Sequence, residues 1–329
     1  MKAIISTKYG LDKLKIEDVP KPVPGDNQVL IKIRASSVTT QDMVLIAGKP
    51  FFVRLMTRSP LRPKTRTPGS DMSGQVEAIG RYIKQFKPGD EVYANLSECG
   101  YGSFAEYVCV PENVLALKPT NLSFEEAAAV PEAALVALQG LRDFGKVKKE
   151  QKILIYSASG GIGTFAVQFA KYYGAEVTGV CSTRNLDLVR SLGADHVIDY
   201  SKEDFTRNGQ RYDLIMAVRY TRPVWAIKRA LAPGGIYVST AGPSIPRLFQ
   251  EFLVGPRIYK NEDKKVEVIT TKLSQNDLIF TKELIESGKV RPVIDRSFSL
   301  YKTPEALRYY SRGHARGRVI ISIGQDSNY

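Results

Sequence analysis

A cluster of small side chains follows the apolar segment 153–156. The cluster is Ser157-Ala158-Ser159-Gly160-Gly161-Ile162-Gly163, and it contains the glycine-rich spacing G-x-G-x-x-G with alanine in the first position. An apolar strand is predicted before it and a helix after it, which is the context that this motif requires. A glycine at position 160 lets the backbone approach a pyrophosphate, and one at 163 lets the helix pack closely on the strand.

The N-terminus of the predicted helix adds free N–H groups that attract an anion. We therefore predict a dinucleotide site, and the alternative is a tight strand–helix turn without a ligand. The predicted contacts are Ala158, Ser159, Gly160, Gly161, Ile162 and Gly163.

The segment after the next predicted strand distinguishes the two nicotinamide dinucleotides. A site for the cofactor without a 2′-phosphate usually has Asp or Glu about 20 residues after the motif. Here Ser182, Thr183 and Arg184 follow the strand, and no carboxylate precedes Asp187. Hydroxyls and a guanidinium bind a phosphate, which an acid would repel. These residues predict NADPH, with a helix cap and a solvated first turn as the alternative.

Three further residues are candidates for cofactor contacts. Tyr200 ends the predicted strand 196–200 and is expected to cover the adenine. Gly242 follows a later strand, where backbone groups would meet the nicotinamide. Arg318 in the last strand is a candidate for the phosphates. The alternatives are an ordinary aromatic at a strand end for Tyr200 and a solvated charge for Arg318.

The elements that position these residues follow from the texture of the chain. The first 120 residues consist of short apolar segments between Pro, Gly and Asp turns, which is typical of β-structure. Ser123 and Glu126 form a capping box before an Ala-rich helix. From residue 152, strands alternate with helices that stop at Gly174 and Gly193.

Alternating strands and helices predict a parallel, doubly wound sheet. We therefore predict an α/β fold with a Rossmann domain and a discontinuous β-rich domain. Residues 1–123 and 272–329 form the β-rich domain, and residues 124–271 form the Rossmann domain. The predicted edge strand 265–271 is a candidate dimer contact, because an uncovered edge exposes unpaired backbone groups.

Composition sets broad limits on location and partners. The 329 residues carry a net charge of +13 and three scattered cysteines without a C-x-x-C pair. No apolar run reaches the roughly 18 residues of a membrane helix, and the N-terminus lacks an apolar leader, so we expect a cytoplasmic protein without a transmembrane segment. The positive charge alone is compatible with binding to nucleic acid. The sequence contains no recognised nucleic-acid-binding module, however, so we expect no nucleic acid as a partner.

Segment 48–69 is basic and has no acidic residue. Apolar side chains, including Phe51, Leu55 and Leu61, alternate with its lysines and arginines. A surface loop packed through its apolar side is one interpretation. A lid over the active site and a contact with a membrane surface or RNA are the others.

Several segments, in order, resemble zinc-free medium-chain dehydrogenases/reductases of the quinone oxidoreductase type. They are PGSDMSGQVEAIG (68–80), FKPGDEVYA (86–94), SFAEYV (103–108), SASGGIGTFAVQFAK (157–171) and LGADHVIDY (192–200). The resemblance implies a GroES-like β-rich catalytic domain, a Rossmann domain and an active site in the cleft between them. It also implies a homodimer, with quinones and α,β-unsaturated carbonyl compounds as the substrates.

The chain departs from the zinc-dependent members of that family. Thr39 stands where they have a zinc-binding cysteine, and Ser70-Asp71 replaces their His-Glu pair. The four-cysteine lobe is absent, so we expect no metal. Without a metal to polarise a plain ketone, the hydride acceptor must already be electrophilic, as a quinone or an enone is.

The resemblance puts Thr39, Asp42 and Met43 in the pocket wall, with Ser70 opposite and Tyr101 at the border. Thr39 or Ser70 would donate a hydrogen bond to the carbonyl, and a purely structural role is the alternative for all four wall residues. Two other functions stay open. One is a zinc-free aldehyde or alcohol dehydrogenase, and the other is a non-catalytic NADPH-binding protein that contacts RNA.

Overall fold

The computed structural model describes residues 1–49, 51, 54–55, 59–63, 65–218, 223–240 and 263–324. The chain divides into two compact units, each described by itself. The first comprises Met1–Glu132, Leu273–Gly288 and Pro292–Tyr329, and the second comprises Ala133–Lys272 and Lys289–Arg291. The first unit extends beyond the predicted boundary at residue 123, because helix α3 (Phe124–Ala128) packs with Ala35 and Ile320 of the β-rich sheet.

The first unit is built on a sheet that joins strands from both ends of the chain. Its order is β14-β15-β3-β4-β5-β7, with β6 paired to β3. The C-terminal strand β15 pairs antiparallel with β3, which explains why this unit is discontinuous in sequence. A separate antiparallel pair, β1 and β2, completes its strands. The bounds are β1 Lys2–Ser6, β2 Leu14–Asp18, β3 Gln28–Val38, β4 Asp71–Ile79, β5 Glu91–Asn95, β6 Tyr107–Pro111, β7 Ala116–Leu117, β14 Ile294–Ser299 and β15 Arg318–Ser322.

The helices of the first unit begin at recognisable caps. The capping box predicted before α3 is confirmed: Ser123 Oγ accepts from the Glu126 N–H, and the Glu126 carboxylate accepts from the Ser123 N–H. A second capping box, between Thr39 and Asp42, starts α1. The remaining bounds are α1 Thr40–Ala47, α10 Gln275–Glu286 and α11 Thr303–Ser311, with 3₁₀ turns η1 Leu11–Lys13, η2 Glu112–Val114 and η6 Leu300–Lys302.

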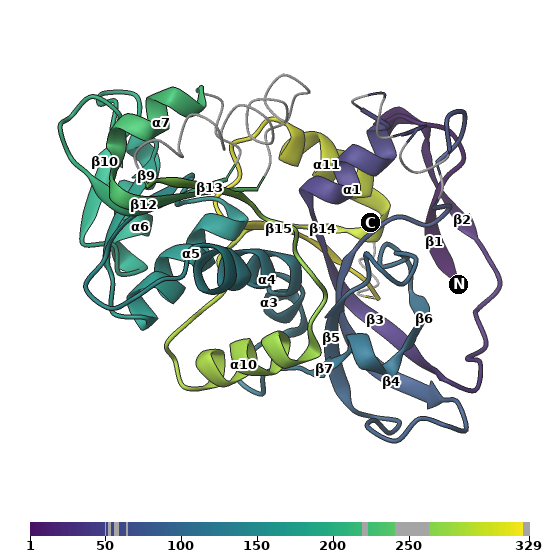
Figure 1. Cartoon of the computed structure of the whole chain (residues 1–329). Helices are drawn as coiled ribbons and strands as arrows, with labels where there is room; N and C mark the ends of the chain where they lie inside the picture. Colours follow the sequence, from purple (N-terminus) through teal and green to yellow (C-terminus); the bar gives the residue numbers. More distant parts are fainter. Residues whose placement is uncertain are drawn as a thin grey trace. The chain divides into compact units, whose positions relative to one another are not determined.

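The second unit has a six-stranded sheet in which every pairing is parallel. Its order, β10-β9-β8-β11-β12-β13, is the doubly wound Rossmann order, in which the first strand lies in the middle. Helices α5 and α6 cover one face and α7 the other (Figure 1). The strands are β8 Lys152–Tyr156, β9 Glu176–Cys181, β10 His196–Asp199, β11 Tyr212–Ala217, β12 Leu231–Ser239 and β13 Lys265–Val268.

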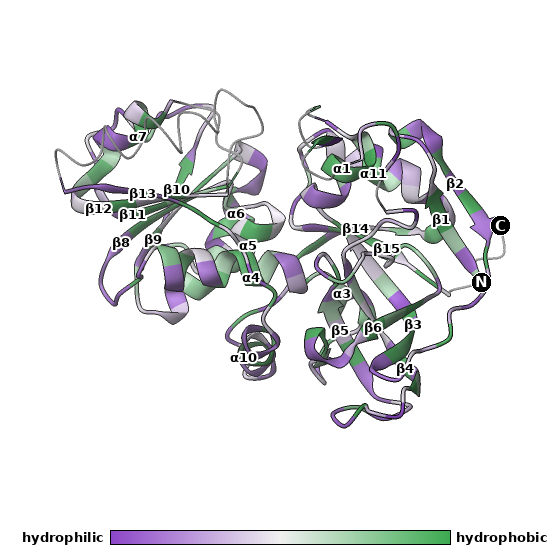
Figure 2. Cartoon of the chain, turned by 45° about the vertical axis from the view of Figure 1, so that its right-hand side comes forward, coloured by the Kyte–Doolittle hydropathy of each residue, from purple (hydrophilic) through white to green (hydrophobic). Residues whose placement is uncertain are grey.

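Hydrophobic residues line the central strands of each unit (Figure 2), and they form the buried cores. The predicted helix stops after α5 and α6 are confirmed, since Gly174 and Gly193 have φ values of 78° and 99°, a conformation that other residues rarely adopt. The helical elements are α4 Pro131–Gln139, the π-helical turn η3 Gly140–Phe144, α5 Gly161–Tyr172, the 3₁₀ turn η4 Thr183–Asn185, α6 Leu186–Ser191 and α7 Val224–Ala230.

Candidate functional site

The glycine-rich turn lies at the point of the second unit where the strand order reverses. The turn follows β8, which lies between β9 on one side and β11 on the other. Two hydrogen bonds tie it to both neighbours: the Ala158 N–H donates to the Val180 carbonyl at 3.0 Å, and Ser157 Oγ donates to the Val218 carbonyl at 2.9 Å. Dinucleotides bind at this crevice in doubly wound sheets.

Gly163 and Gly160 have different reasons to be glycine. A Cβ at Gly163 would lie 2.1 Å from the Ser157 carbonyl oxygen, so the predicted close packing of helix on strand is confirmed. Among the described residues, a Cβ at Gly160 would meet only that same oxygen, at 3.4 Å, which is an ordinary contact. Packing among the described residues therefore does not require Gly160, and the space that they leave beside it suits a bound pyrophosphate.

The other residues of the motif complete this cradle. Ala158 is fully buried and Ser159 is 8% exposed. Gly160 is the N-cap of α5, and Gly161 and Ile162 follow it in the first turn, where backbone N–H groups have no acceptor within the helix. The turn thus fits an anionic group at the N-terminus of a 12-residue helix.

Residues 182–184, which follow β9, lie beside a carboxylate that their own sequence does not contain. Thr183 Oγ1 donates to Asp199 Oδ2 at 2.5 Å, and Ser201 Oγ donates to Asp199 Oδ1 at 2.7 Å. These hydrogen bonds hold the pKa of Asp199 below its ordinary value. No carboxylate precedes Asp187 in the sequence after β9, but the neighbouring strand β10 supplies Asp199. The hydroxyl proton of Thr183 is committed to this carboxylate.

Tyr200 follows β10 beside the end of β9. Its N–H donates to the Cys181 carbonyl at 3.1 Å, and its side chain is 50% exposed. An exposed aromatic ring next to the 182–184 segment fits the predicted cover for an adenine. Gly242, the candidate for the nicotinamide, lies outside the described residues.

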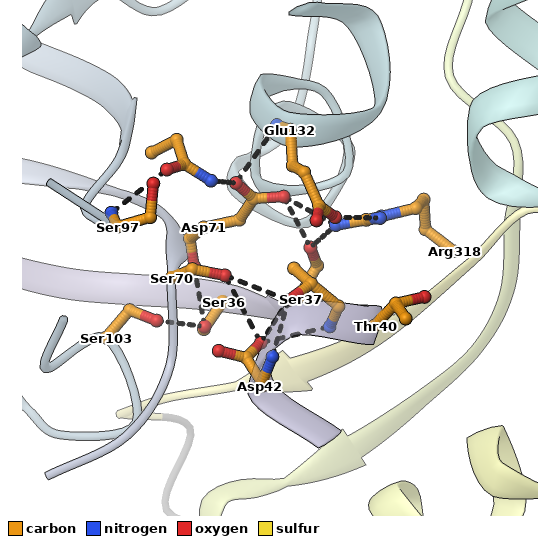
Figure 3. A network of polar contacts seen from close by, with 12 residues as sticks. Ser36, Ser37, Thr40, Asp42, Ser70, Asp71, Ser97, Ser103, Glu132 and Arg318 are labelled. Atoms are coloured by element: carbon orange, nitrogen blue, oxygen red, sulfur yellow. Dashed lines mark hydrogen bonds and ion pairs between the residues drawn. The ribbon is translucent and has the colours of Figure 1, made fainter. Parts of the chain in front are cut away.

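The structure argues against Arg318 as a ligand of the cofactor phosphates. Its side chain is only 3% exposed and lies inside the first unit, where it pairs with Asp71 at 2.5 Å and Glu132 at 3.1 Å. It also donates to Ser37 Oγ at 2.6 Å (Figure 3). Two carboxylates and a hydroxyl already engage the guanidinium, so its role is structural.

Asp71 is the centre of this buried polar network. In addition to Arg318, it accepts hydrogen bonds from the Asn95 side chain at 2.8 Å and from the Glu132 N–H at 3.0 Å. Burial raises the pKa of Asp71, and the Arg318 guanidinium opposes that shift. The network connects β4, β5, the start of α4 and β15 within the first unit.

Thr39, Asp42 and Ser70 do meet one another, but they are buried rather than exposed to a pocket. All three have 0% exposure. Thr39 Oγ1 donates to Asp42 Oδ2 at 2.9 Å and lies 3.1 Å from Ser70 Oγ. The capping box of α1 explains this arrangement, so the geometry favours the structural alternative over the predicted pocket lining. Met43 also packs against the core of this unit.

Asp42 is nevertheless electrostatically unusual. Its Oδ1 is buried and has no hydrogen-bond partner in the described part of the chain. Burial, followed by repulsion from Glu132, raises the pKa of Asp42 from 3.8 to about 7. A neutral carboxyl is therefore the favoured form at mildly acidic pH.

Two other predicted features lie in the same unit. Tyr101 Oη accepts from Gln41 Nε2 at 2.9 Å, and burial raises the pKa of Tyr101 to about 12. In the basic segment, the Arg54 guanidinium stacks over Tyr9 at 4.3 Å. Its Nε donates to the Gly48 carbonyl at 2.9 Å, within the segment. The segment thus contacts the unit through Arg54, whereas its apolar side chains Phe51, Leu55 and Leu61 are 60%, 57% and 86% exposed. Residues 50, 52–53, 56–58 and 64 lie outside the described part.

The donor set of the first unit does not fit a catalytic zinc ion. Zinc sites in proteins use thiolate, imidazole and carboxylate ligands, whereas Thr39 and Ser70 contribute hydroxyls that bond to each other and to Asp42. Among the described residues, His, Cys, Asp and Glu form no group of three that could hold a metal.

Asn185, which the sequence did not single out, connects the glycine-rich turn with the segment after β9. Its side-chain nitrogen lies 2.9 Å from Ser159 Oγ in the glycine-rich turn and 3.3 Å from Ser182 Oγ after β9. The residue is only 4% exposed. In the sequence, Asn185 stands at the start of a predicted helix, and this position predicts only a helix cap.

Comparisons with known proteins agree with this architecture. Residues 25–120 match the family described as "Alcohol dehydrogenase GroES-like domain", and residues 192–321 match "Zinc-binding dehydrogenase". The quinone oxidoreductase from Coxiella burnetii has a similar structure, with a TM-score of 0.87, 28% identity and coverage of 98% of this chain and 99% of that one. Over the parts of the chain described above, no helix combines the length and apolar character needed to cross a bilayer.

Two plant proteins are similar in sequence over almost the whole chain. Quinone-oxidoreductase QR1, chloroplastic, of Triphysaria versicolor is 34% identical over 337 residues, covering 98% of both chains. The NADPH-dependent alkenal/one oxidoreductase, chloroplastic, of Arabidopsis thaliana is 37% identical over 337 residues, covering 98% of this chain and 79% of that protein.

Proposed function

The chain belongs to the quinone oxidoreductase-like branch of the medium-chain dehydrogenase/reductase superfamily, and from this premise we propose that it is an NADPH-dependent, zinc-independent reductase of quinones or α,β-unsaturated carbonyl compounds. The observation that carries the proposal is the glycine-rich turn at the centre of the Rossmann sheet, where packing leaves the approach to Gly160 open.

Different residues of the second unit bind different parts of the cofactor. The turn and the first N–H groups of α5 bind the pyrophosphate. Ser182 and Arg184 bind the 2′-phosphate, and the exposed ring of Tyr200 covers the adenine. Thr183 serves a different purpose, since its hydroxyl restrains Asp199.

The substrate class follows from the chemistry that the described residues do not supply. NADPH, when bound, supplies a hydride, and a plain ketone then needs a strong electrophile to stabilise the alkoxide. A metal ion is the usual electrophile, and His, Cys, Asp and Glu among the described residues form no group of three that could hold one. A quinone or an enone delocalises the added charge itself, so positioning the reactants is the main task of the protein. The names of the two plant relatives, a quinone oxidoreductase and an alkenal/one oxidoreductase, support this choice.

We also propose a homodimer, in which the edge strand β13 pairs with its counterpart. A cytoplasmic location stays a prediction, because both plant relatives are described as chloroplastic.

The direct test is oxidation of NADPH and NADH in the presence of quinones, enones and simple aldehydes. We expect turnover of quinones or enones with NADPH, and much slower reaction with aldehydes. Preferential reduction of aldehydes, or no reaction with any acceptor despite tight cofactor binding, contradicts the proposal.

Cofactor preference is tested by titration of both dinucleotides. One charge-assisted hydrogen bond contributes about 1.5–3 kcal/mol, so we expect NADPH to bind about ten- to more than a hundredfold more tightly than NADH. Arg184→Ala should weaken NADPH only, and Ser182→Asp should reverse the preference. Arg190→Ala is the matched control, because Arg190 pairs with Asp187 on α6. Equal losses for both dinucleotides in Arg184→Ala contradict this assignment.

A further inference from the structure

The side chain of Asn185 does not perform the usual task of its position. Asn185 is the N-cap of α6, where an asparagine commonly accepts from the N–H groups of the first turn. Here its side chain makes no such bond. Its nitrogen instead points to Ser159 and Ser182, at 2.9 and 3.3 Å from their hydroxyl oxygens. The side chain of Asn185 thus contacts two parts of the proposed cofactor site and does not cap the helix.

The identity of the donor determines where the serine protons point. A carboxamide nitrogen only donates hydrogen bonds, so both serine oxygens accept from Asn185. Each hydroxyl proton is then left to donate in another direction, and the hydrogen bonds of the described residues include no acceptor for either one. Both hydroxyls are therefore set as donors.

The two neighbouring hydroxyls are different. Ser157 Oγ donates to the Val218 carbonyl at 2.9 Å, and Thr183 Oγ1 donates to Asp199 at 2.5 Å. Their protons are used within the chain. Of these four hydroxyls around the turn and the end of β9, only the two that contact Asn185 keep a proton for a ligand.

A second observation indicates that this place is completed by a ligand. Asn185 Oδ1 is buried and has no hydrogen-bond partner among the residues that the structure describes, although buried acceptors are almost always satisfied in folded proteins. A hydroxyl of the bound ribose is the kind of donor that would satisfy it. Two serine protons thus lie beside a buried acceptor that the described residues leave unsatisfied.

We propose that Asn185 is a positioning residue that orients Ser159 toward the pyrophosphate and Ser182 toward the 2′-phosphate, so that one carboxamide couples the two phosphate subsites. This inference rests on the proposed function, because it requires NADPH at the turn. It assigns the distinction between NADPH and NADH to the hydroxyl of Ser182 and not to that of Thr183, which donates to Asp199.

The test is a set of titrations of the whole chain with each dinucleotide, in which the fluorescence of the reduced cofactor reports binding. Ser159→Ala should weaken NADPH and NADH alike by about tenfold or more, and Ser182→Ala should weaken NADPH alone by a similar factor. In the Asn185→Leu background, both serine substitutions should lose most of their effect, because the hydroxyls are no longer oriented. Ser191→Ala is the matched control, since that hydroxyl bonds to the Leu188 carbonyl within α6.

A structural role for Asn185 predicts a different pattern. The serine effects would then stay the same in the presence and absence of the carboxamide, and this additivity would overturn the inference. Asn185→Asp has the same shape and reverses the hydrogen-bond polarity, so it serves if Asn185→Leu does not fold. A wild-type protein that binds no NADPH would remove the proposed function and the inference together. Tight NADPH binding with additive or absent serine effects would remove the inference alone.

Discussion

Gly160 and Gly163 provide a matched pair of substitutions that separates folding from cofactor binding. Both lie within the same turn and both would become alanine, so the chemical change is identical. The surroundings differ: the added Cβ lies 2.1 Å from the Ser157 carbonyl oxygen at Gly163 and 3.4 Å from it at Gly160. Gly163→Ala should therefore destabilise the second unit, and Gly160→Ala should mainly weaken NADPH.

The expected loss for Gly163→Ala follows from the atoms that its Cβ would meet. They are backbone atoms of Ser157 and Ala158, the farthest at 2.8 Å, and backbone cannot turn away as a flexible side chain does. Overpacking of this kind costs about 1–3 kcal/mol or more, and the upper end applies here. Alanine recovers about 1 kcal/mol through its higher helix propensity. We expect a net loss of about 2 kcal/mol or more.

Gly160→Ala should have a small effect on stability. The φ and ψ of Gly160 are −84° and 172°, which alanine adopts without strain. Alanine is a poorer N-cap than glycine, so a loss of less than about 1 kcal/mol is expected. Its methyl group would occupy the open space beside the turn, and the affinity for NADPH should fall by about tenfold or more, which is about 1.4 kcal/mol or more.

Thermal unfolding without cofactor and NADPH titration measure the two effects. For a unit of this size, about 2 kcal/mol corresponds to a decrease of roughly 4–8 °C in the midpoint for Gly163→Ala. Gly160→Ala should unfold within about 4 °C of wild type. Unchanged NADPH affinity in Gly160→Ala would refute the assignment of the pyrophosphate to this turn. A Gly163→Ala protein as stable as wild type would refute the argument from close packing.

Three further predictions concern the first unit and the assembly. The pKa of Asp42 is about 7 in the folded chain and 3.8 ordinarily, so its contribution to stability is complete below about pH 4 and is lost as the pH rises through about 7. Relative to the Asp42→Asn protein, the wild type should lose up to roughly 4 kcal/mol of unfolding free energy over this interval. Parallel pH profiles of the two proteins would contradict the pKa shift. Arg318→Met should destabilise by about 3–5 kcal/mol because it leaves Asp71 buried without its cation, and adding Asp71→Asn should restore most of the thermal midpoint; no recovery would show that the two side chains are not coupled. Sedimentation equilibrium at micromolar concentration should give a dimer, and a monomer would contradict pairing through β13.

Features that depend on neighbouring residues could be predicted from the sequence. The alternation of strands and helices after residue 152 indicated the Rossmann unit, because hydrophobic periodicity and glycine stops are local properties. The capping box at Ser123 and the close packing at Gly163 also follow from short-range geometry. The boundary after the β-rich unit was less accurate, because α3 belongs to the unit on which it packs, and packing partners are not encoded next to the helix.

The roles of individual polar side chains depended on residues far away in the chain. Arg318 lies 247 positions from Asp71, so its sequence context gave no indication that a carboxylate would neutralise it in the protein interior. Thr183 and Asp199 are 16 positions apart, yet the parallel pairing of β9 and β10 brings their segments together at the sheet edge. The sequence by itself therefore determined the fold class and the position of the cofactor turn. Only the tertiary structure decided which hydroxyls, carboxylates and cations remain available to a ligand, because that depends on contacts between segments that no local pattern specifies.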